Sequence, residues 1–215
     1  MQKEFSLDDI LKFEQRYRAT FVNSLGGFKS LVLIGTANES GQTNLATFNS
    51  LFHLGANPPL FGFIVRPDAV ARHTLNNILA LNEFTVNHVS ETFFRQAHQT
   101  SARYDADTSE FNATGLTPVY KKDCKAPFVK ESHIQISAVF LRKVDIEENG
   151  TSLIIAKMKA VYIPEDCLAA DGFIDIEKAG SITCSGLDSY HSTTKIARLA
   201  YAKTNVPTTD LKLTQ

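Results

Sequence analysis

Small polar side chains interrupt a segment that otherwise has the character of a β-strand. Threonine, asparagine and serine alternate there with alanine and phenylalanine, where a purely structural strand would carry larger apolar residues. Such groups suit a flat heteroaromatic ligand, whose ring edge needs donors and acceptors from side chains and main chain. The alternative interpretation is an exposed sheet edge. The candidate ligand-binding residues are Asn44, Ala46, Thr47, Phe48, Asn49 and Ser50.

A second polar cluster lies where a strand ends and a helix is expected to begin. Free backbone N–H groups give a helix N-terminus a partial positive charge, and cationic and hydroxyl side chains there form a cradle for phosphate. Basic residues at this position oppose the helix dipole, which favours a bound anion. Ordinary capping by Thr74 is the alternative. The cluster consists of Arg66, Arg72, His73, Thr74 and Asn77.

The common catalytic signatures are missing from the sequence. It has no P-loop, strand-linked GxGxxG, GxSxG, HExxH or CxxC motif, which argues against ATP use, Rossmann dinucleotide binding, serine hydrolysis and zinc catalysis. The six histidines include no tight pair with metal-ligand spacing, so we predict no metal site.

Composition narrows the class of protein further. The 215 residues are 43% hydrophobic, enough for one domain with a full core. The 22 basic and 23 acidic residues give a net charge of -1, so nothing favours nucleic acid or an anionic membrane as a partner. Three separated cysteines, no signal-peptide pattern and no run of about 18 apolar residues predict reduced thiols and a cytoplasmic protein.

Apolar spacing then predicts the elements that position the two clusters. One or two amphipathic helices fit residues 6–25, and strands fit 30–37, 43–55, 60–66 and 83–89. Helices are expected at 71–82 and 91–102, and residues 104–118 are expected to form an ordered loop. From residue 133, two long alternating strands meet across Asn149 and Gly150, a strong hairpin signal. Many strands with few helices favour an antiparallel barrel, closed or partly split.

The two clusters, separated by Pro58 and Pro59, resemble in their order the flavin reductase-like family of FMN-binding split-barrel proteins. The likeness begins with TNLATFNSLFHLGANPPLFGFIVRP and continues with RHTLNNI and EFTVNHV. It extends through SARYDADTSEFNATGLTP, KAPFVKES, VYIPEDCLAADGFIDIEKAG and SGLDSYHSTTKIARLAYAK. It covers roughly residues 28–203, which we take as the core of a single domain spanning 1–215, preceded by a helical extension at 1–27.

The resemblance implies a mainly β fold with flanking α-helices, an antiparallel FMN-binding split β-barrel of the Greek-key type. It places non-covalent FMN at the barrel edge, with the ring and ribityl chain against the ATFNS segment and the phosphate at the RHTLNNI helix start. It also implies a homodimer in which partner residues lie near the flavin. By analogy, Tyr190, Arg198 and Tyr201 help to close the site, or serve packing and dimer contact.

The activity implied by the resemblance is that of an FMN-dependent oxidoreductase. NADH or NADPH gives hydride to the flavin N5, and electrons then pass to free flavin or another acceptor, including a redox partner protein. The cofactor carries this chemistry, so no residue is assigned as an essential acid or base. The alternative is an electron carrier of the flavoredoxin type that never meets nicotinamide, and an oxidase of the pyridoxamine-phosphate type ranks last.

Overall fold

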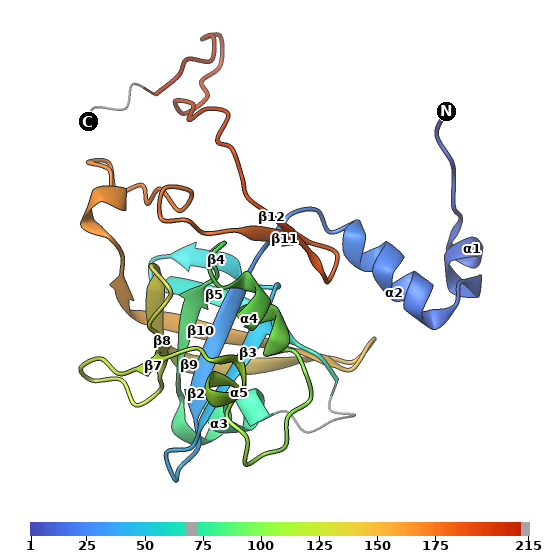
Figure 1. Ribbon diagram of the computed structural model, residues 1–215. Coiled ribbons are helices and arrows are strands. Elements are labelled where there is room, and N and C mark those ends of the chain that lie inside the picture. Colours follow the sequence, from blue (N-terminus) through green and yellow to red (C-terminus); the bar gives the residue numbers. More distant parts are fainter. Residues whose placement is uncertain (68–72, 212–215) are drawn as a thin grey trace.

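Seven antiparallel strands form one sheet at the centre of the protein (Figure 1). The computed structural model describes residues 1–67 and 73–211. From edge to edge the strands follow the order β3-β2-β6-β9-β10-β5-β4. Their bounds are β2 Val32–Ala37, β3 Thr43–Phe48, β4 Phe52–Ala56, β5 Pro59–Val65, β6 Glu83–His88, β9 Gln135–Ile146 and β10 Thr151–Tyr162.

The two edge strands of this sheet are neighbours in sequence. β3 ends at Phe48 and β4 begins at Phe52, so a short link joins strands at opposite ends of the order. Such a link spans about 15 Å at most, so the sheet must curl until its edges approach. β3 and β4 are nevertheless not paired in the described chain. The barrel is therefore split, which confirms the predicted fold class.

The inside of the curled sheet holds the main apolar core. Phe63, Phe84 and Ile154 are fully buried there. Helix α3 (His73–Leu81) packs its buried Leu75 and Ile78 into the same core. These contacts fix the first turn of α3 beside the barrel.

Two short helices, α4 (Phe94–Gln99) and α5 (Glu110–Thr114), cover the opposite face of β2 and β3. Leu33 and Leu45 of these strands pack there with Phe111. β2 is therefore buried on both of its faces. α5 lies inside the segment that was predicted to be an ordered loop, and burial of Phe111 is what anchors it.

Residues 126–129, which include the short strand β8 (Phe128–Val129), cross the outer face of the sheet at β2 and β6. Thr85 Oγ1 donates to Pro127 O at 2.6 Å, and Val129 N donates to Asn87 Oδ1 at 3.0 Å. A Cβ atom on Gly35 would lie only 2.2 Å from Pro127 O. Only glycine at position 35 allows this approach.

Smaller elements complete the barrel. One three-stranded sheet has the order β1-β11-β12, and a two-stranded sheet pairs β7 with β8. Their bounds are β1 Lys29–Ser30, β7 Pro118–Val119, β8 Phe128–Val129, β11 Thr183–Ser185 and β12 Ser189–His191, with a 3₁₀ helix η1 at Glu165–Cys167.

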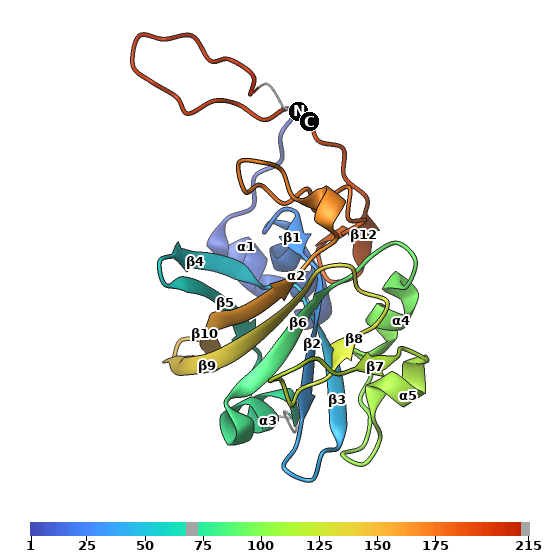
Figure 2. The same ribbon diagram turned by 90° about the vertical axis from the view of Figure 1, so that its left-hand side faces the viewer.

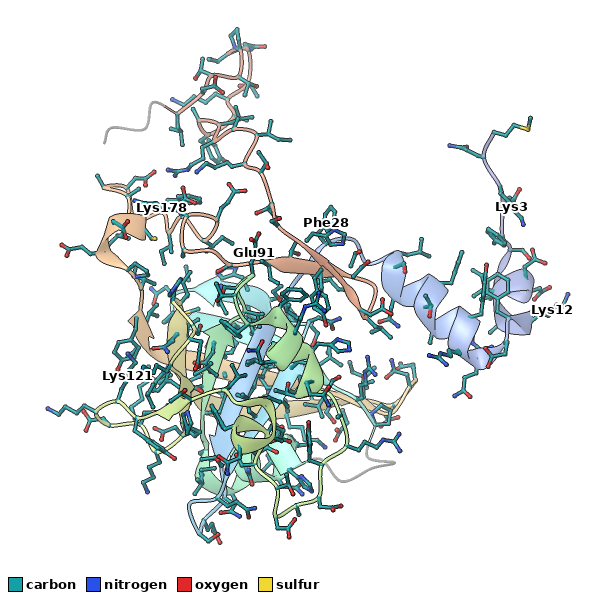
Figure 3. All side chains as sticks on the ribbon, in the orientation of Figure 1. Lys3, Lys12, Phe28, Glu91, Lys121 and Lys178 are labelled. Atoms are coloured by element: carbon teal, nitrogen blue, oxygen red, sulfur yellow. The ribbon has the colours of Figure 1, made fainter. Side chains whose placement is uncertain are left out.

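Both ends of the chain extend away from the barrel (Figure 1 and Figure 2). Residues 1–27, here called the N-terminal arm, contain α1 (Leu7–Lys12) and α2 (Gln15–Ser24), neither of which has a buried residue. Figure 3 shows Lys3 and Lys12 at the far end of the arm. At the other terminus, Leu199 and Asp210 pair and close a projecting loop.

Most predicted elements are confirmed, including both N-terminal helices and the β9–β10 hairpin across Asn149 and Gly150. The prediction of one strand over residues 43–55 was wrong. β3 stops at Phe48 because the next residues cross from one sheet edge to the other. No helix in the described part of the chain is long and apolar enough to span a membrane.

Candidate functional site

A cleft of about 940 Å³ follows the unpaired side of β3. It reaches from the first turn of α3 to the turn between β11 and β12, and the segment 100–104 after α4 forms another part of its wall. This volume is near the upper end of the range of small-molecule sites. The cleft therefore has room for a cofactor and for a second planar molecule beside it.

The free edge of β3 exposes backbone hydrogen-bonding groups to this cleft. In an antiparallel pair, successive residues bond alternately toward the neighbouring strand and away from it. Leu45 N donates outward to Glu110 Oε2 at 2.8 Å, so Leu45 faces away from β2. Thr47, two residues later, faces the same way, and its N–H and C=O have no backbone partner within residues 1–67 and 73–211. It offers one donor and one acceptor side by side.

The side chain of Thr47 also lacks a partner. Its Oγ1 is buried and makes no hydrogen bond within the described residues, although the residue lines the cleft. A buried hydroxyl without a partner costs about 1–3 kcal/mol. An unpaired hydroxyl beside an unpaired peptide group is the arrangement that a ring with several polar edge atoms would satisfy.

At its other end, the cleft meets the first turn of α3. His73 and Thr74 line it there, and Asn44 Nδ2 donates to Thr74 Oγ1 at 2.9 Å. The first backbone N–H groups of a helix have no intrahelical acceptor, and together with an imidazole and a hydroxyl they suit a phosphate. Arg66 lines the same cleft at the end of β5.

A buried carboxyl group lies between these two ends. Glu110 is only 7% exposed and lines the cleft. Burial raises the pKa of Glu110 above its ordinary value, while the hydrogen bond from Leu45 N and the nearby His73 act in the opposite direction. Within the described chain, Glu110 has no ion-pair partner.

One wall of the cleft is aromatic and contains His98 and Tyr190. Tyr190 OH and His98 Nδ1 lie 2.5 Å apart and share a hydrogen bond, and the Tyr190 ring is tilted against Phe94 at a centroid distance of 5.4 Å. Burial raises the pKa of Tyr190, and Cys184, which also lines the cleft, adds to this effect. A planar ligand could lie between this wall and the edge of β3.

The structure brings most of the predicted site residues together. The cleft is lined by Asn44, Ala46, Thr47, Phe48, Asn49, Ser50, Arg66, His73 and Thr74. Two of them also hold the fold together, since Ser50 Oγ accepts from Ile64 N at 3.0 Å and Asn49 Nδ2 donates to Gly186 O at 3.2 Å.

Other candidates lie elsewhere. Asn77 does not line the cleft, and its Nδ2 donates to Thr36 Oγ1 at 3.1 Å. Arg72 is outside the described residues. Tyr190 does reach the cleft, but Arg198 pairs with Asp171 and lies over the Phe173 ring, and Tyr201 is 92% exposed.

Several lining residues were absent from the sequence-based set. They come from segments where the sequence pattern predicted a helix or a loop, or assigned no element. The likeness over SARYDADTSEF was a signal for Arg103, Tyr104 and Glu110. The missed lining residues include His98, Thr100, Arg103, Tyr104, Glu110 and Cys184.

Comparison with known proteins gives the context for this cleft. An uncharacterized protein of Aquifex aeolicus (strain VF5) is 30% identical over 115 residues, which span 53% of this chain and 59% of that protein. A crystal structure from Shewanella frigidimarina NCIMB 400, assigned provisionally as a flavin reductase with a split barrel domain, is 48% identical with a TM-score of 0.90, covering 94% of this chain and 100% of that one. Flavoredoxin of Desulfovibrio vulgaris (Miyazaki F) shares the fold at 22% identity and a TM-score of 0.68, covering 83% and 91%.

The family profile named Flavin reductase like domain matches residues 25–177, from the end of the N-terminal arm through the β9–β10 hairpin. This range contains the free edge of β3, the first turn of α3 and Glu110. The chain therefore belongs to the flavin reductase-like family of split-barrel proteins.

Proposed function

We propose that the protein binds FMN in this cleft and works as an NAD(P)H-dependent flavin reductase. The observation that carries the proposal is at Thr47 on the edge strand β3, which lines the cleft: within the described residues its backbone N–H and C=O have no backbone partner and its buried hydroxyl has no partner at all. A flavin ring edge carries acceptors and a donor in one plane, so these groups fit it. When bound, FMN accepts hydride from reduced nicotinamide and passes electrons to a second acceptor.

The chain's own residues orient and enclose the cofactor. Thr47 and the neighbouring Ala46 and Phe48 hold the ring at the edge of β3, and Asn49 and Ser50 border the same part of the cleft. His73, Thr74 and Arg66 hold the phosphate, where Asn44 fixes the Thr74 hydroxyl. The aromatic wall of His98 and Tyr190 bounds the space in which nicotinamide or a second flavin stacks.

The second candidate function is an electron carrier that holds the same FMN without oxidising nicotinamide. The fold is shared with a flavoredoxin, and the cleft geometry suits both functions. We favour the reductase because the cleft has room for a second planar molecule.

A homodimer is part of the proposal. Residues that pair directly across β9, β10, β5 and β4 share the outer face. One row consists of Val144, Leu153 and Ile64, and the next of Arg142, Ile155, Gly62 and Phe52, so Arg142 is the one charged member of two otherwise apolar rows. An outer face of this kind would be polar in a monomer. Because Ile64 also lines the cleft, a second copy on this face would border the flavin.

The dimer is tested with a charge on this face. Ile155→Asp should give a monomer by light scattering, whereas Leu79→Asp, at an exposed leucine on α3, should leave the dimer intact. A monomeric wild-type protein would contradict the proposal.

We also place the protein in the cytoplasm, in keeping with its three unpaired, buried cysteines.

The function itself is tested by adding FMN to the purified protein, removing unbound flavin, and then adding NADH or NADPH without oxygen. Visible flavin absorption that bleaches on addition supports the reductase. Absorption that persists, but is lost on addition of a reduced ferredoxin, supports the carrier. A protein that retains no flavin refutes both.

A further inference from the structure

Glu110 contacts the edge strand that the proposed flavin uses. Its Oε2 accepts a hydrogen bond from Leu45 N at 2.8 Å, although 65 residues separate the two in sequence. The adjacent Ser109 Oγ lies 2.6 Å from Thr43 Oγ1. α5 is thus attached to the first half of β3 at two outward-facing residues, Thr43 and Leu45.

This attachment divides the free edge of β3 into two parts. Glu110 occupies the outward N–H of Leu45. The next outward residue, Thr47, lines the cleft, and its hydroxyl and peptide groups are unpaired within the part of the chain that the structure describes. A strand edge with all its groups unpaired would let a ligand, or another strand, bind in more than one register. The Glu110 carboxyl group leaves one register open.

Burial makes the position of Glu110 energetically unfavourable for a carboxyl group. Glu110 is 7% exposed, lies against Leu45 and Phe111 of an apolar cluster, and has no ion-pair partner within the described chain. A glutamine or an apolar residue would cost less to bury. A buried, weakly compensated carboxyl group in a cleft is typical of a functional position.

We propose that Glu110 is a positioning residue, which fixes the register of the β3 edge so that Thr47 receives the flavin ring. This inference rests on the flavin binding proposed above. Glu110 acts through β3 and not on the phosphate, so it should affect ligands with and without phosphate equally. Riboflavin, which carries the ring but no phosphate, separates the two ends of the cleft.

The test measures dissociation constants of FMN and riboflavin by quenching of flavin fluorescence. Glu110→Ala should raise both constants by about tenfold, because an orphaned N–H at Leu45 loosens the edge. Glu110→Gln should restore binding to within about twofold, since its amide oxygen still accepts from Leu45 N. Thr43→Val, which removes the other tie between α5 and β3, should leave both constants unchanged.

Three results would overturn the inference: unchanged constants in Glu110→Ala, an equal loss in Thr43→Val, or a loss restricted to FMN. If Glu110→Ala does not fold, Glu110→Asp replaces it, because the shorter carboxylate keeps the charge but cannot reach Leu45 N. Binding in Glu110→Asp equal to that in Glu110→Gln would then refute the inference. Failure of the wild-type protein to bind either flavin refutes the proposed function instead.

Discussion

Both edge strands of the seven-stranded sheet, β3 and β4, have backbone groups that no neighbouring strand pairs, and the two edges are protected differently. β4 is short, bulged between His53 and Gly55, and ends at the Pro58 turn, features that discourage another strand from pairing with an edge. β3 has none of these protections. Its edge is covered by Glu110 in one half and borders the cleft in the other.

The difference between β3 and β4 shows what distinguishes a sheet edge that can bind a ligand from one that is only protected against pairing with another strand. Most side chains of β4 are exposed, so water satisfies its unpaired groups. Thr47 on β3 has a buried hydroxyl that finds no partner among residues 1–67 and 73–211. An enclosed edge with unpaired groups is costly without a ligand, and this cost favours binding.

The largest effect should come from the phosphate end, where α3 meets the start of β3. The double variant His73→Ala/Thr74→Val should raise the FMN dissociation constant about a hundredfold, because it removes an imidazole and a hydroxyl that can donate hydrogen bonds at the anion site. Riboflavin binding should be unchanged. Isothermal titration of both ligands checks this, with Leu79→Ser on the exposed side of α3 as the control. An equal loss for riboflavin would place the ring at α3.

The comparison of the edges is tested most directly at Thr47. Thr47→Val keeps the shape but removes the hydroxyl, so FMN and riboflavin should both bind about tenfold more weakly. Because the orphaned group is gone, the ligand-free variant should be as stable as the wild type or more stable. His53→Ala on β4 is the matched change at the other edge and should alter neither affinity. Unchanged binding in Thr47→Val would remove the distinction between the edges.

An effect on stability and not on flavin binding is expected at His88 on β6. Burial lowers the pKa of His88 from 6.5 to about 4, so the folded protein keeps this imidazole neutral. The unfolded chain binds the proton first as pH falls, so stability should decrease between about pH 6.5 and 4, by about 1–3 kcal/mol. Denaturant unfolding of His88→Gln should show a weaker decrease than the wild type. His53→Gln, at an exposed histidine, is the control.

The sequence predicted the strands better than the site that they form. The Asn149 and Gly150 turn and the alternating strands around it are local signals, and they place β9 and β10 correctly. The break after Phe48 was missed, because only the curled sheet makes the chain cross there from one edge to the other.

Local sequence signals also predicted the cleft only in part. Thr47 and Thr74 stand in recognisable local patterns, whereas Glu110 gains its role from Leu45, far away in sequence. Asn77 is the opposite case. Its place near the start of α3 predicted a ligand contact, but its amide donates to Thr36 Oγ1 instead. Local pattern identifies groups capable of binding, and tertiary contacts decide which of them face the ligand.

One thiol of the protein can serve as a reporter of cleft occupancy. Cys124, Cys167 and Cys184 are all buried and unpaired, and of the three Cys184 alone lines the cleft. Burial raises the pKa of Cys184, so its alkylation is slow. A bound flavin should slow the alkylation of Cys184 further. Cys124, whose pKa burial raises to about 11, does not line the cleft and is the reference thiol. The ratio of labelling at the two positions, read by mass spectrometry, would measure how often the cleft is filled, without any introduced probe.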